Sequence, residues 1–356
     1  MKTTKDALIV GGGVIGLTSA FQLARAGWRV TVFDPAPGCG ATWAAAGMIA
    51  PIAEIGPGEK ANYELQRGAL VAWRTFADDV RATTQKNLLI VETGTLLLGW
   101  DGSDRRLVDQ FSLVAAELGV EPRRVSRSEE PAMFEGVSPR IPDGLLVGGD
   151  AWLNPDQVVE FVSEANRTLD VSFVDEAVLH VGGDANGVKA TTASGEFVGD
   201  IGIMATGAFP VPSGVTTSGT HSVRPVHGIT VRVRGIDRSS QPMIRSFVKG
   251  STVYMVSRPG GYNVLGASSE ERSETGAHVG EVQRLLRDAL DVVPALETAS
   301  ILEVREGNRP ASEDLRPFFE VLTDGRWAWS SGHFRHGVTL APIAAREALR
   351  FAESFK

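Results

Sequence analysis

The N-terminal segment carries the pattern that most restricts how this chain can fold. Residues 7–10 (ALIV) form a short apolar run, which is typical of a buried parallel strand. The glycine loop GGGVIG follows at 11–16, and apolar side chains then recur at helical spacing until Gly27, which fits the end of a helix. Residues 29–33 (RVTVF) are predicted to form a second strand. This order predicts a Rossmann-type βαβ unit.

The residues of the loop have distinct physical roles in holding a dinucleotide. Gly11 permits the tight turn, Gly13 lets the backbone approach a pyrophosphate, and Gly16 lets helix and strand pack closely. The helix begins near Val14 and Ile15, where N–H groups and the positive end of the helix dipole face the phosphates.

Asp34 stands at the end of the second predicted strand. Its carboxylate can accept hydrogen bonds from both ribose hydroxyls of an adenosine, and it would repel a 2′-phosphate, which disfavours NADP. The loop and this acid do not separate FAD from NAD. A glycine-rich turn without a ligand also stays open at this point.

Six further segments carry signals that a dinucleotide site alone leaves unexplained. They are residues 40–50 (GATWAAAGMIA), 152–157 (WLNPDQ), 200–207 (DIGIMATG), 224–228 (RPVHG), 254–271 (YMVSRPGGYNVLGASSEE) and 332–342 (GHFRHGVTLAP). Together with the glycine loop they resemble the D-amino-acid oxidase-like FAD oxidoreductases, a family that includes glycine oxidase, sarcosine oxidase and D-amino-acid oxidase. The last two segments look most like glycine oxidase of the thiamine-biosynthesis type. For residues 40–50 alone, the alternative is an ordinary helix N-terminus capped by Thr42.

The resemblance implies an FAD whose isoalloxazine ring lies between residues 42–48 and 332–342. Cys39 is the only cysteine, so the cysteinyl link of monomeric sarcosine oxidases is excluded and the flavin is expected to be noncovalent. The residues that the glycine loop and the resemblance assign to the cofactor are Gly11, Gly13, Val14, Ile15, Gly16, Asp34, Ala41, Thr42, Ala46, Gly47, Met48, Thr206, Gly207, Gly332, His333, Arg335, Gly337, Val338 and Thr339.

The resemblance also predicts an α/β fold with two domains. A discontinuous Rossmann-like FAD-binding domain is expected from residues 1–80, 150–220 and 305–356. An α+β substrate domain with a mixed or antiparallel sheet over the flavin is expected from residues 81–149 and 221–304. Within the latter, strands are predicted in 88–100, 220–235, 252–258 and 261–268, and helices in 104–118 and 280–291.

The family reaction removes a hydride from the α-carbon of a neutral amine to flavin N5. Oxygen then reoxidises the flavin and gives H2O2, and the imine hydrolyses to an oxo acid. A substrate carboxylate needs a cation, preferably a guanidinium. Residues 306–317 (EGNRPASEDLRP) resemble a family stretch whose arginine, here Arg309, binds the substrate carboxylate. Arg335 corresponds to an arginine near the substrate, Tyr254 to a tyrosine that hydrogen-bonds the carboxylate, and Met48 to a methionine beside the flavin.

Each of these residues also has a plainer interpretation. The arginines could form surface salt bridges, Tyr254 could be an ordinary strand residue, and Met48 could serve packing alone. His227, where many relatives have Lys or Arg, is interpreted as a structural histidine. Two departures from the family pattern, Leu315-Arg316 and Ser257, leave the substrate's identity open.

Several functions remain in competition. The first hypothesis is FAD-dependent oxidative deamination of glycine or another small amino acid. Alternatives are an FAD-dependent dehydrogenase that passes electrons to an acceptor other than oxygen, and a flavin-binding subunit of a heteromeric oxidase. An NAD dehydrogenase would leave residues 40–50 and 332–342 unexplained.

Composition restricts location and partners. Hydrophobic residues make up 43% and charged residues 22%, which is ordinary for a soluble protein. The net charge of −8 gives no support to binding of nucleic acid or anionic membranes. One cysteine rules out zinc sites built from several cysteines, and no metal is expected. Neither a signal peptide nor a membrane span is recognised, so a cytoplasmic protein is expected. Homo-oligomerisation is left open.

Overall fold

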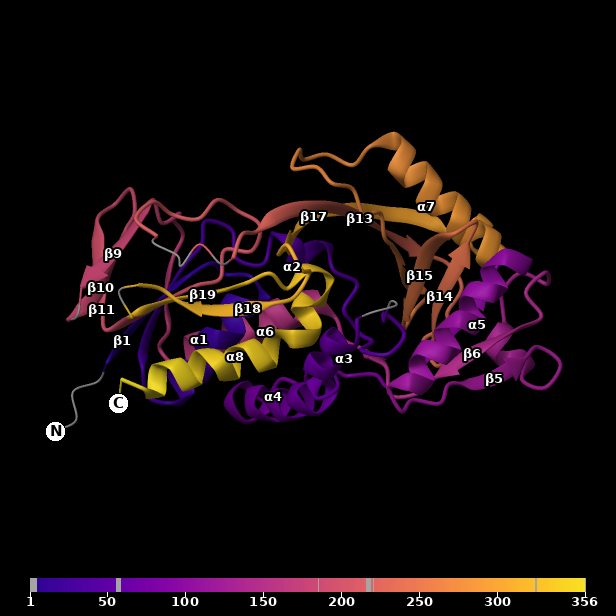
Figure 1. Ribbon diagram of the computed structural model, residues 1–356, viewed down its shortest axis with the longest axis horizontal. Helices are drawn as coiled ribbons and strands as arrows, with labels where there is room; N and C mark the ends of the chain where they lie inside the picture. Colours follow the sequence, from indigo (N-terminus) through magenta and orange to yellow (C-terminus); the bar gives the residue numbers. More distant parts are fainter. Residues whose placement is uncertain are drawn as a thin grey trace.

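The computed structural model describes residues 5–55, 59–184, 186–215, 219, 221–323 and 325–355. Residues 1–4, on which the expected absence of a signal peptide partly depends, lie outside the described residues. Positions 1, 220 and 356, which are limits of the expected FAD domain, lie outside them too. The described chain forms two bodies arranged along the longest axis of the molecule (Figure 1).

A six-stranded sheet forms the centre of the first body. Its order is β18-β19-β12-β1-β2-β8, and β1 pairs in parallel with both β2 and β12. The bounds are β1 (Asp6–Val10), β2 (Arg29–Phe33), β8 (Ser172–Val174), β12 (Ile201–Met204), β18 (Phe318–Val321) and β19 (Trp327–Ser331). The strands predicted at 7–10 and 29–33 are confirmed, and helix α1 (Val14–Arg25) connects them.

Successive residues of these strands are buried on opposite faces of the sheet, one covered by helices and the other by a small second sheet. Ile9 and Ile203 pack with helices α1 and α8 (Gly337–Glu353), whose outer neighbours are α6 (Pro155–Thr168), α4 (Ala69–Thr84) and α3 (Lys60–Gln66). Val10 and Met204 pack on the opposite side against a small antiparallel sheet of β9 (His180–Asp184), β10 (Gly187–Thr191) and β11 (Glu196–Gly199). The alternation is that of a sheet covered on both faces.

An eight-stranded sheet forms the second body, in the order β17-β13-β16-β15-β14-β4-β6-β5. All its neighbours are antiparallel except β14 and β4, so the predicted mixed sheet is confirmed. The bounds are β4 (Thr95–Gly99), β5 (Arg123–Ser126), β6 (Asp143–Val147), β13 (Arg224–Arg234), β14 (Met243–Val248), β15 (Ser251–Arg258), β16 (Tyr262–Gly266) and β17 (Ser300–Ala311).

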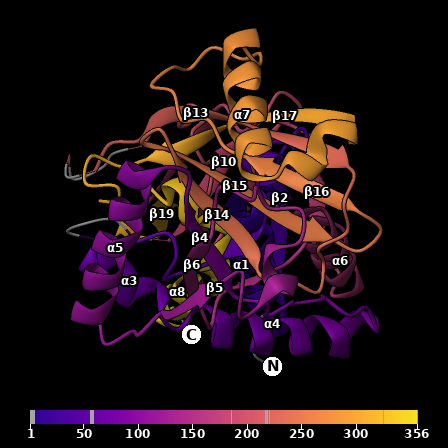
Figure 2. The ribbon, with the colours of Figure 1, turned by 90° about the vertical axis from the view of Figure 1, so that its right-hand side faces the viewer.

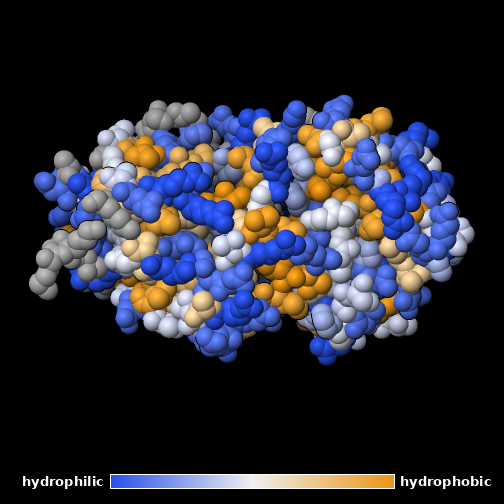
Figure 3. All heavy atoms as spheres, turned by 90° about the horizontal axis from the view of Figure 1, so that it is seen from below, coloured by the Kyte–Doolittle hydropathy of each residue, from blue (hydrophilic) through white to orange (hydrophobic). Residues whose placement is uncertain are grey.

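Two helices cover opposite faces of this sheet, as Figure 2 shows. Helix α7 (Val279–Val292) packs through Leu285 on Ile229 and Met255, and α5 (Gly102–Glu117) packs through Phe111 on Leu97. These are the two helices predicted in 280–291 and 104–118. Seen from below, apolar atoms gather at the middle of the surface, over the junction of the two bodies (Figure 3).

The structure confirms the α/β fold class and corrects one local prediction. Residues 88–100, predicted to form strands with a glycine-containing turn, contain only one strand, β4, because the residues before it form a single bridge between Val91 and Trp152. The expected domain limits at 80 and 305 fall inside α4 and β17. The division into domains therefore stays a proposal, and a limit after Ala311 would keep β17 whole in the second sheet. Among the described residues no helix is long and apolar enough to cross a membrane.

Candidate active site

A cavity of about 560 Å³ lies where the two bodies meet, within the usual range for ligand sites. One side is formed by the start of α1, by α2 (Ala41–Ala44) with β3 (Met48–Ile49), and by residues 330–338. The other side is formed by β13, β14, β15, β17 and α5. The cavity therefore joins the glycine loop to the face of the eight-stranded sheet.

The glycine loop closes tightly on the end of β12 and leaves its outer surface open. Gly11 has φ +109°, and a Cβ there would lie 2.7 Å from the carbonyl carbon of Ala205. A Cβ on Gly16 would overlap the Gly11 carbonyl. At Gly13 only the hydroxyl oxygen of Thr42 would come near, at 3.5 Å. These positions suit the roles predicted for the three glycines, two in the turn and one facing a ligand.

Asp34 and Thr42 fix this loop through backbone N–H groups. Gly12 N donates to Asp34 Oδ2 at 2.6 Å, and Ala36 N donates to Oδ1 at 2.8 Å. Val14 N donates to Thr42 Oγ1 at 3.0 Å. The alternative that Thr42 caps a helix is wrong, because Thr42 lies inside α2 and its hydroxyl contacts the first turn of α1 instead.

The structure brings most of the predicted cofactor residues together around the cavity. Those that line it are Gly13, Val14, Ile15, Ala41, Thr42, Ala46, Gly47, Met48, Gly207, His333, Arg335, Gly337 and Val338. Those that do not line it are Gly11, Gly16, Asp34, Thr206, Gly332 and Thr339. Thr339 Oγ1 donates to the Met48 carbonyl at 3.1 Å, so it joins α8 to β3. Gly332 takes a left-handed turn at φ +74°.

Open polar groups at this site fit a large nucleotide cofactor. Among the described residues, two buried hydroxyls have no hydrogen-bond partner: that of Ser330, which lines the cavity, and that of Thr206, which lies between the lining residues Ala205 and Gly207. A Cβ on Gly207 would meet nothing within 4 Å. Buried polar groups are normally satisfied, so these hydroxyls are groups that a bound molecule could complete.

Arg309 reaches the cavity from β17 and lies flat over strand β13. A Cβ on Gly228 would come within 2.6 Å of its Cζ, so only glycine leaves room for the guanidinium there. Nη1 donates to the carbonyls of Ser268 at 3.1 Å and His227 at 3.5 Å. Burial lowers the pKa of Arg309. No carboxylate of the described residues lies within ion-pair distance of it, which leaves its charge available to an anionic ligand.

Tyr254 lies on the same face of the sheet. In β15 it is opposite Arg245 on one side and Gly266 on the other, and a Cβ on Gly266 would overlap the ring. Burial raises the pKa of Tyr254 to about 12. The phenol therefore stays protonated at neutral pH and can donate a hydrogen bond to an anion.

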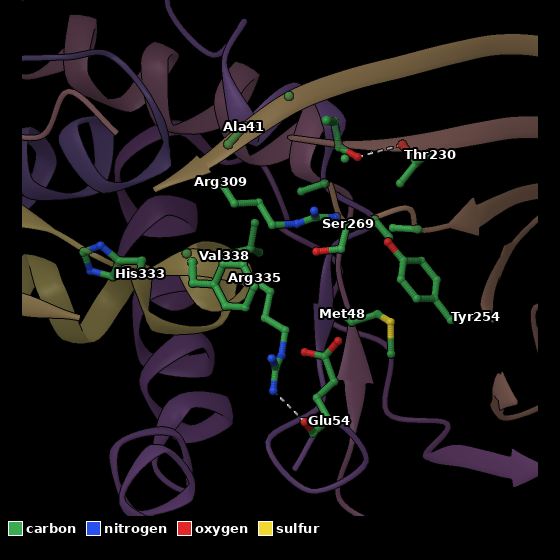
Figure 4. Close-up of a pocket in the computed structure, with 18 of the residues that line it drawn as sticks. Ala41, Met48, Glu54, Thr230, Tyr254, Ser269, Arg309, His333, Arg335 and Val338 are labelled. Atoms are coloured by element: carbon green, nitrogen blue, oxygen red, sulfur yellow. Dashed lines mark hydrogen bonds between the residues drawn. The ribbon is translucent and has the colours of Figure 1, made fainter. Parts of the chain in front are cut away.

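Arg335 lines the same cavity but has acidic and carbonyl partners. Its Nη2 lies 2.7 Å from Glu59 Oε2 and donates to the Glu54 carbonyl at 3.0 Å. Met48, in β3, lies alongside (Figure 4). The two arginines selected from the sequence thus differ: Glu59 balances the charge of Arg335, whereas Arg309 has no acidic partner among the described residues.

Three charged residues of the cavity, Glu54, Glu59 and Arg245, were missed in the sequence. Glu54 follows the AAAGM segment on a loop, and Arg245 lies in β14 beside Tyr254. Arg245 Nη1 is 3.7 Å from Glu54 Oε1, and His336 Nδ1 is 3.7 Å from Glu54 Oε2. Burial holds the pKa of His336 well below its usual value and lowers that of His333 to about 4, so both imidazoles are neutral at pH 7. Only the position of Glu54 after the small-residue segment could have signalled it.

His227 and Ser257 take part in packing rather than in the cavity. His227 is 1% exposed, and its Nε2 lies 3.1 Å from Glu306 Oε2, on the strand that also carries Arg309. The Ser257 hydroxyl hydrogen-bonds Asn263 across the β15–β16 turn. Neither residue lines the cavity, so the departure at Ser257 does not alter its wall.

Comparisons with known proteins agree with this geometry. The sequence profile of the DAO family, described as FAD dependent oxidoreductase, matches residues 6–350. The chain is 27% identical over 349 residues to glycine oxidase of Geobacillus kaustophilus (strain HTA426), which covers 95% of this chain and 90% of that protein. The crystal structure of glycine oxidase from Geobacillus kaustophilus superimposes with a TM-score of 0.87 at 24% identity, covering 99% of this chain and 95% of that one. L-proline dehydrogenase from P. horikoshii has the same fold, with a TM-score of 0.82 at 18% identity, covering 100% and 95%.

Proposed function

The chain belongs to the DAO family of FAD-dependent oxidoreductases, and from that premise we propose that it oxidatively deaminates glycine or another small amino acid. The predicted family resemblance and the predicted cofactor, FAD, are confirmed by the match over residues 6–350. The identity of the amino acid and the use of oxygen as electron acceptor belong to the proposal. So do the individual site residues and the domain limits.

A single observation carries the proposal: Arg309 faces the cavity without an acidic partner among the described residues, beside a phenol that stays protonated. A half-buried cation without a counter-charge is costly, and a carboxylate ligand would supply the missing charge and accept hydrogen bonds from both side chains. A carboxylate held here would place the rest of a small amino acid toward Met48 and residues 333–338. A non-catalytic flavin subunit would have no use for such a pair.

The chain's own residues provide binding, orientation and exclusion of water. Gly13, Val14 and Thr42, which line the cavity, would hold the pyrophosphate, and Asp34, which lies beside the loop but outside the cavity, would hold the ribose. FAD, when bound, supplies the electron-accepting chemistry, so the protein needs no side-chain nucleophile. Arg309 and Tyr254 would fix the substrate carboxylate, which limits the approach of the α-carbon to one direction. Met48, 8% exposed, contributes an apolar wall.

A second candidate keeps the same amino-acid site but passes electrons to a quinone or protein instead of oxygen. The fold accommodates both outcomes, because a protein named L-proline dehydrogenase shares it. Reoxidation in air separates the two: fast reoxidation with release of H2O2 supports an oxidase, and slow reoxidation supports a dehydrogenase. A cytoplasmic location and homo-oligomerisation stay predictions.

Anaerobic reduction of the purified yellow protein tests the proposal. Glycine, sarcosine and D-alanine would be added separately. Reduction would be measured as the loss of the absorption band at about 450 nm, which is general to flavins. At least one of these amino acids is expected to bleach the flavin, and Arg309→Met is expected to abolish saturation at the same concentrations while retaining bound FAD. If no amino acid reduces the wild-type flavin, the proposed function is wrong.

A further inference from the structure

Glu54 differs from the other charged residues that line the cavity. Its side chain is 12% exposed, and the side-chain hydrogen bond that Glu54 receives from the described residues goes to its backbone carbonyl and not to its carboxylate. The nearest cationic group is Arg245 Nη1, at 3.7 Å from Oε1, and the neutral His336 lies at 3.7 Å from Oε2. A charged hydrogen bond is normally shorter than 3 Å. The Glu54 carboxylate can therefore accept hydrogen bonds that the described residues do not supply.

The position of Glu54 complements that of Arg309. Figure 4 shows the Arg309 guanidinium and the Glu54 carboxylate reaching into the cavity from different sides, with Met48 alongside. Both line the same cavity, and each acts electrostatically on Tyr254. A small molecule bound to Arg309 would thus have the carboxylate of Glu54 at its other end.

The charges of the cavity describe the ligand that fits. Three arginines (Arg245, Arg309, Arg335) and two glutamates (Glu54, Glu59) line it, so one positive charge is in excess. Arg335 and Glu59 are in close contact, and their charges cancel. The charges of Arg245 and Glu54 also balance, but the two side chains are too far apart to form a hydrogen bond. A ligand with a carboxylate at one end and N–H donors at the other would match this arrangement.

We propose that Glu54 accepts a hydrogen bond from the amino nitrogen of the substrate, so that Arg309 and Glu54 recognise the two ends of an α-amino acid. This inference rests on the proposed function and deepens it. Glu54 would distinguish amino acids from simple carboxylates of the same size, which have no donor at that position, and it would orient the nitrogen and the α-carbon together. Primary and N-substituted amines both retain an N–H donor and both fit this role.

The backbone around Glu54 is fixed by groups other than its own carboxylate. Glu54 N donates to the Ala50 carbonyl at 3.2 Å, and Arg335 donates to the Glu54 carbonyl at 3.0 Å. The carboxylate of Asp150 lies beneath the N–H groups of Ile52 and Ala53. Because these contacts do not involve the Glu54 side chain, Glu54→Gln is expected to keep the fold of the loop and the bound FAD.

Binding of two matched ligands to the holoenzyme tests the inference. The first is whichever amino acid reduces the wild-type flavin, and the second is its analogue with hydrogen in place of the amine, such as acetate for glycine. In Glu54→Gln the amino acid is expected to bind about 10- to 100-fold more weakly, the usual range for loss of a hydrogen bond to a charged group. The carboxylate analogue, followed by its perturbation of the flavin spectrum, should bind as in the wild type or more tightly, because a repelling charge is gone.

Two other variants give the comparison its controls. Arg309→Met should weaken both ligands, since both carry the carboxylate. Glu64→Gln makes the same chemical change in a half-exposed acid of α3 that pairs with Arg67 at the surface, and it should leave both affinities unchanged. If Glu54→Gln fails to retain FAD, Glu54→Asp keeps the charge but withdraws it by one methylene, and it is expected to show the same selective weakening.

The outcomes separate this inference from the function on which it rests. Wild-type flavin that no amino acid reduces overturns the proposed function and, with it, the inference. The wild-type flavin could instead be reduced while Glu54→Gln or Glu54→Asp lowers the affinity for both ligands equally, or lowers the affinity for neither. In that case Glu54 has only a structural role, and the inference alone fails.

Discussion

Asp150 is a fully buried acid whose charge should make the stability of this protein depend on pH. It is 0% exposed and lies beneath the loop that leads to Glu54. Its Oδ2 accepts from Thr95 at 2.8 Å, whereas Oδ1 has no hydrogen bond of normal geometry from the described residues. Burial raises the pKa of Asp150 to about 7, and nearby N–H groups of Ile52 and Ala53 oppose that rise only in part.

The sign and size of the effect follow from this pKa. In the unfolded chain the carboxyl has a pKa of 3.8. Because the native pKa is higher, the native state binds the proton more tightly, and the free energy of unfolding falls as pH rises from about 4 to about 7. Above that window the loss is constant at about 4 kcal/mol, from a difference of about three pH units. For a chain of this length it corresponds to a decrease of about 5 °C in Tm.

Asp150→Asn removes the titration and keeps an oxygen that can accept from Thr95. We expect the Tm of wild type relative to Asp150→Asn to fall by about 5 °C between pH 4.5 and pH 8. Thermal melts followed by circular dichroism and by flavin fluorescence at several pH values measure this difference, and the other acids of the chain cancel in it. Asp143→Asn, which replaces a partly exposed acid, is the control. A difference that is flat with pH, or that rises, would refute the assignment of a raised pKa.

The remaining predictions concern the cavity and the glycine loop. Gly228→Ala places a Cβ against the Arg309 guanidinium, so the KM for the amino acid should rise at least about 10-fold with FAD retained; an unchanged KM contradicts the placement of Arg309. Gly16→Ala drives a Cβ into the Gly11 carbonyl, so purified protein should contain little FAD by its absorption spectrum. Tyr254→Phe removes one donor, and binding of carboxylate ligands should weaken by about 5- to 10-fold; equal affinity would show that the phenol does not contact them.

The elements that could be predicted from the sequence are those set by local rules. Strands β1 and β2, helix α1 and the turn at Gly11 follow from a continuous apolar run, helical spacing and glycine at positions that require it. The strands β13, β15 and β16 also appeared as alternating or β-branched runs. These patterns depend only on residues that are near one another in the sequence, so they can be recognised without the tertiary structure.

Features that depend on distant contacts could not be predicted in the same way. Residues 88–91 look like a strand because they are apolar, but among them only Val91 forms a β-bridge, with Trp152. Thr42 has the composition of a helix cap, but the arrival of α1 gives its hydroxyl a different partner. In both cases the local preference is satisfied by a segment far away in sequence, and no pattern within the segment specifies it.

The same limit explains why the sequence could not rank the arginines. Arg309 and Arg335 are both arginines in family-like segments, and nothing near either residue in the chain shows whether an acid will neutralise it. The fold brings Glu59 to Arg335 and Glu54 toward Arg245, while Gly228 leaves Arg309 space over a strand that offers only carbonyl groups. An unbalanced buried cation costs stability unless a ligand supplies the anion. Of these two arginines, Arg309, whose charge no acid of the described residues balances, is therefore the one better suited to bind the substrate, and Glu54, held 3.7 Å from its nearest cation, is its counterpart for the amine.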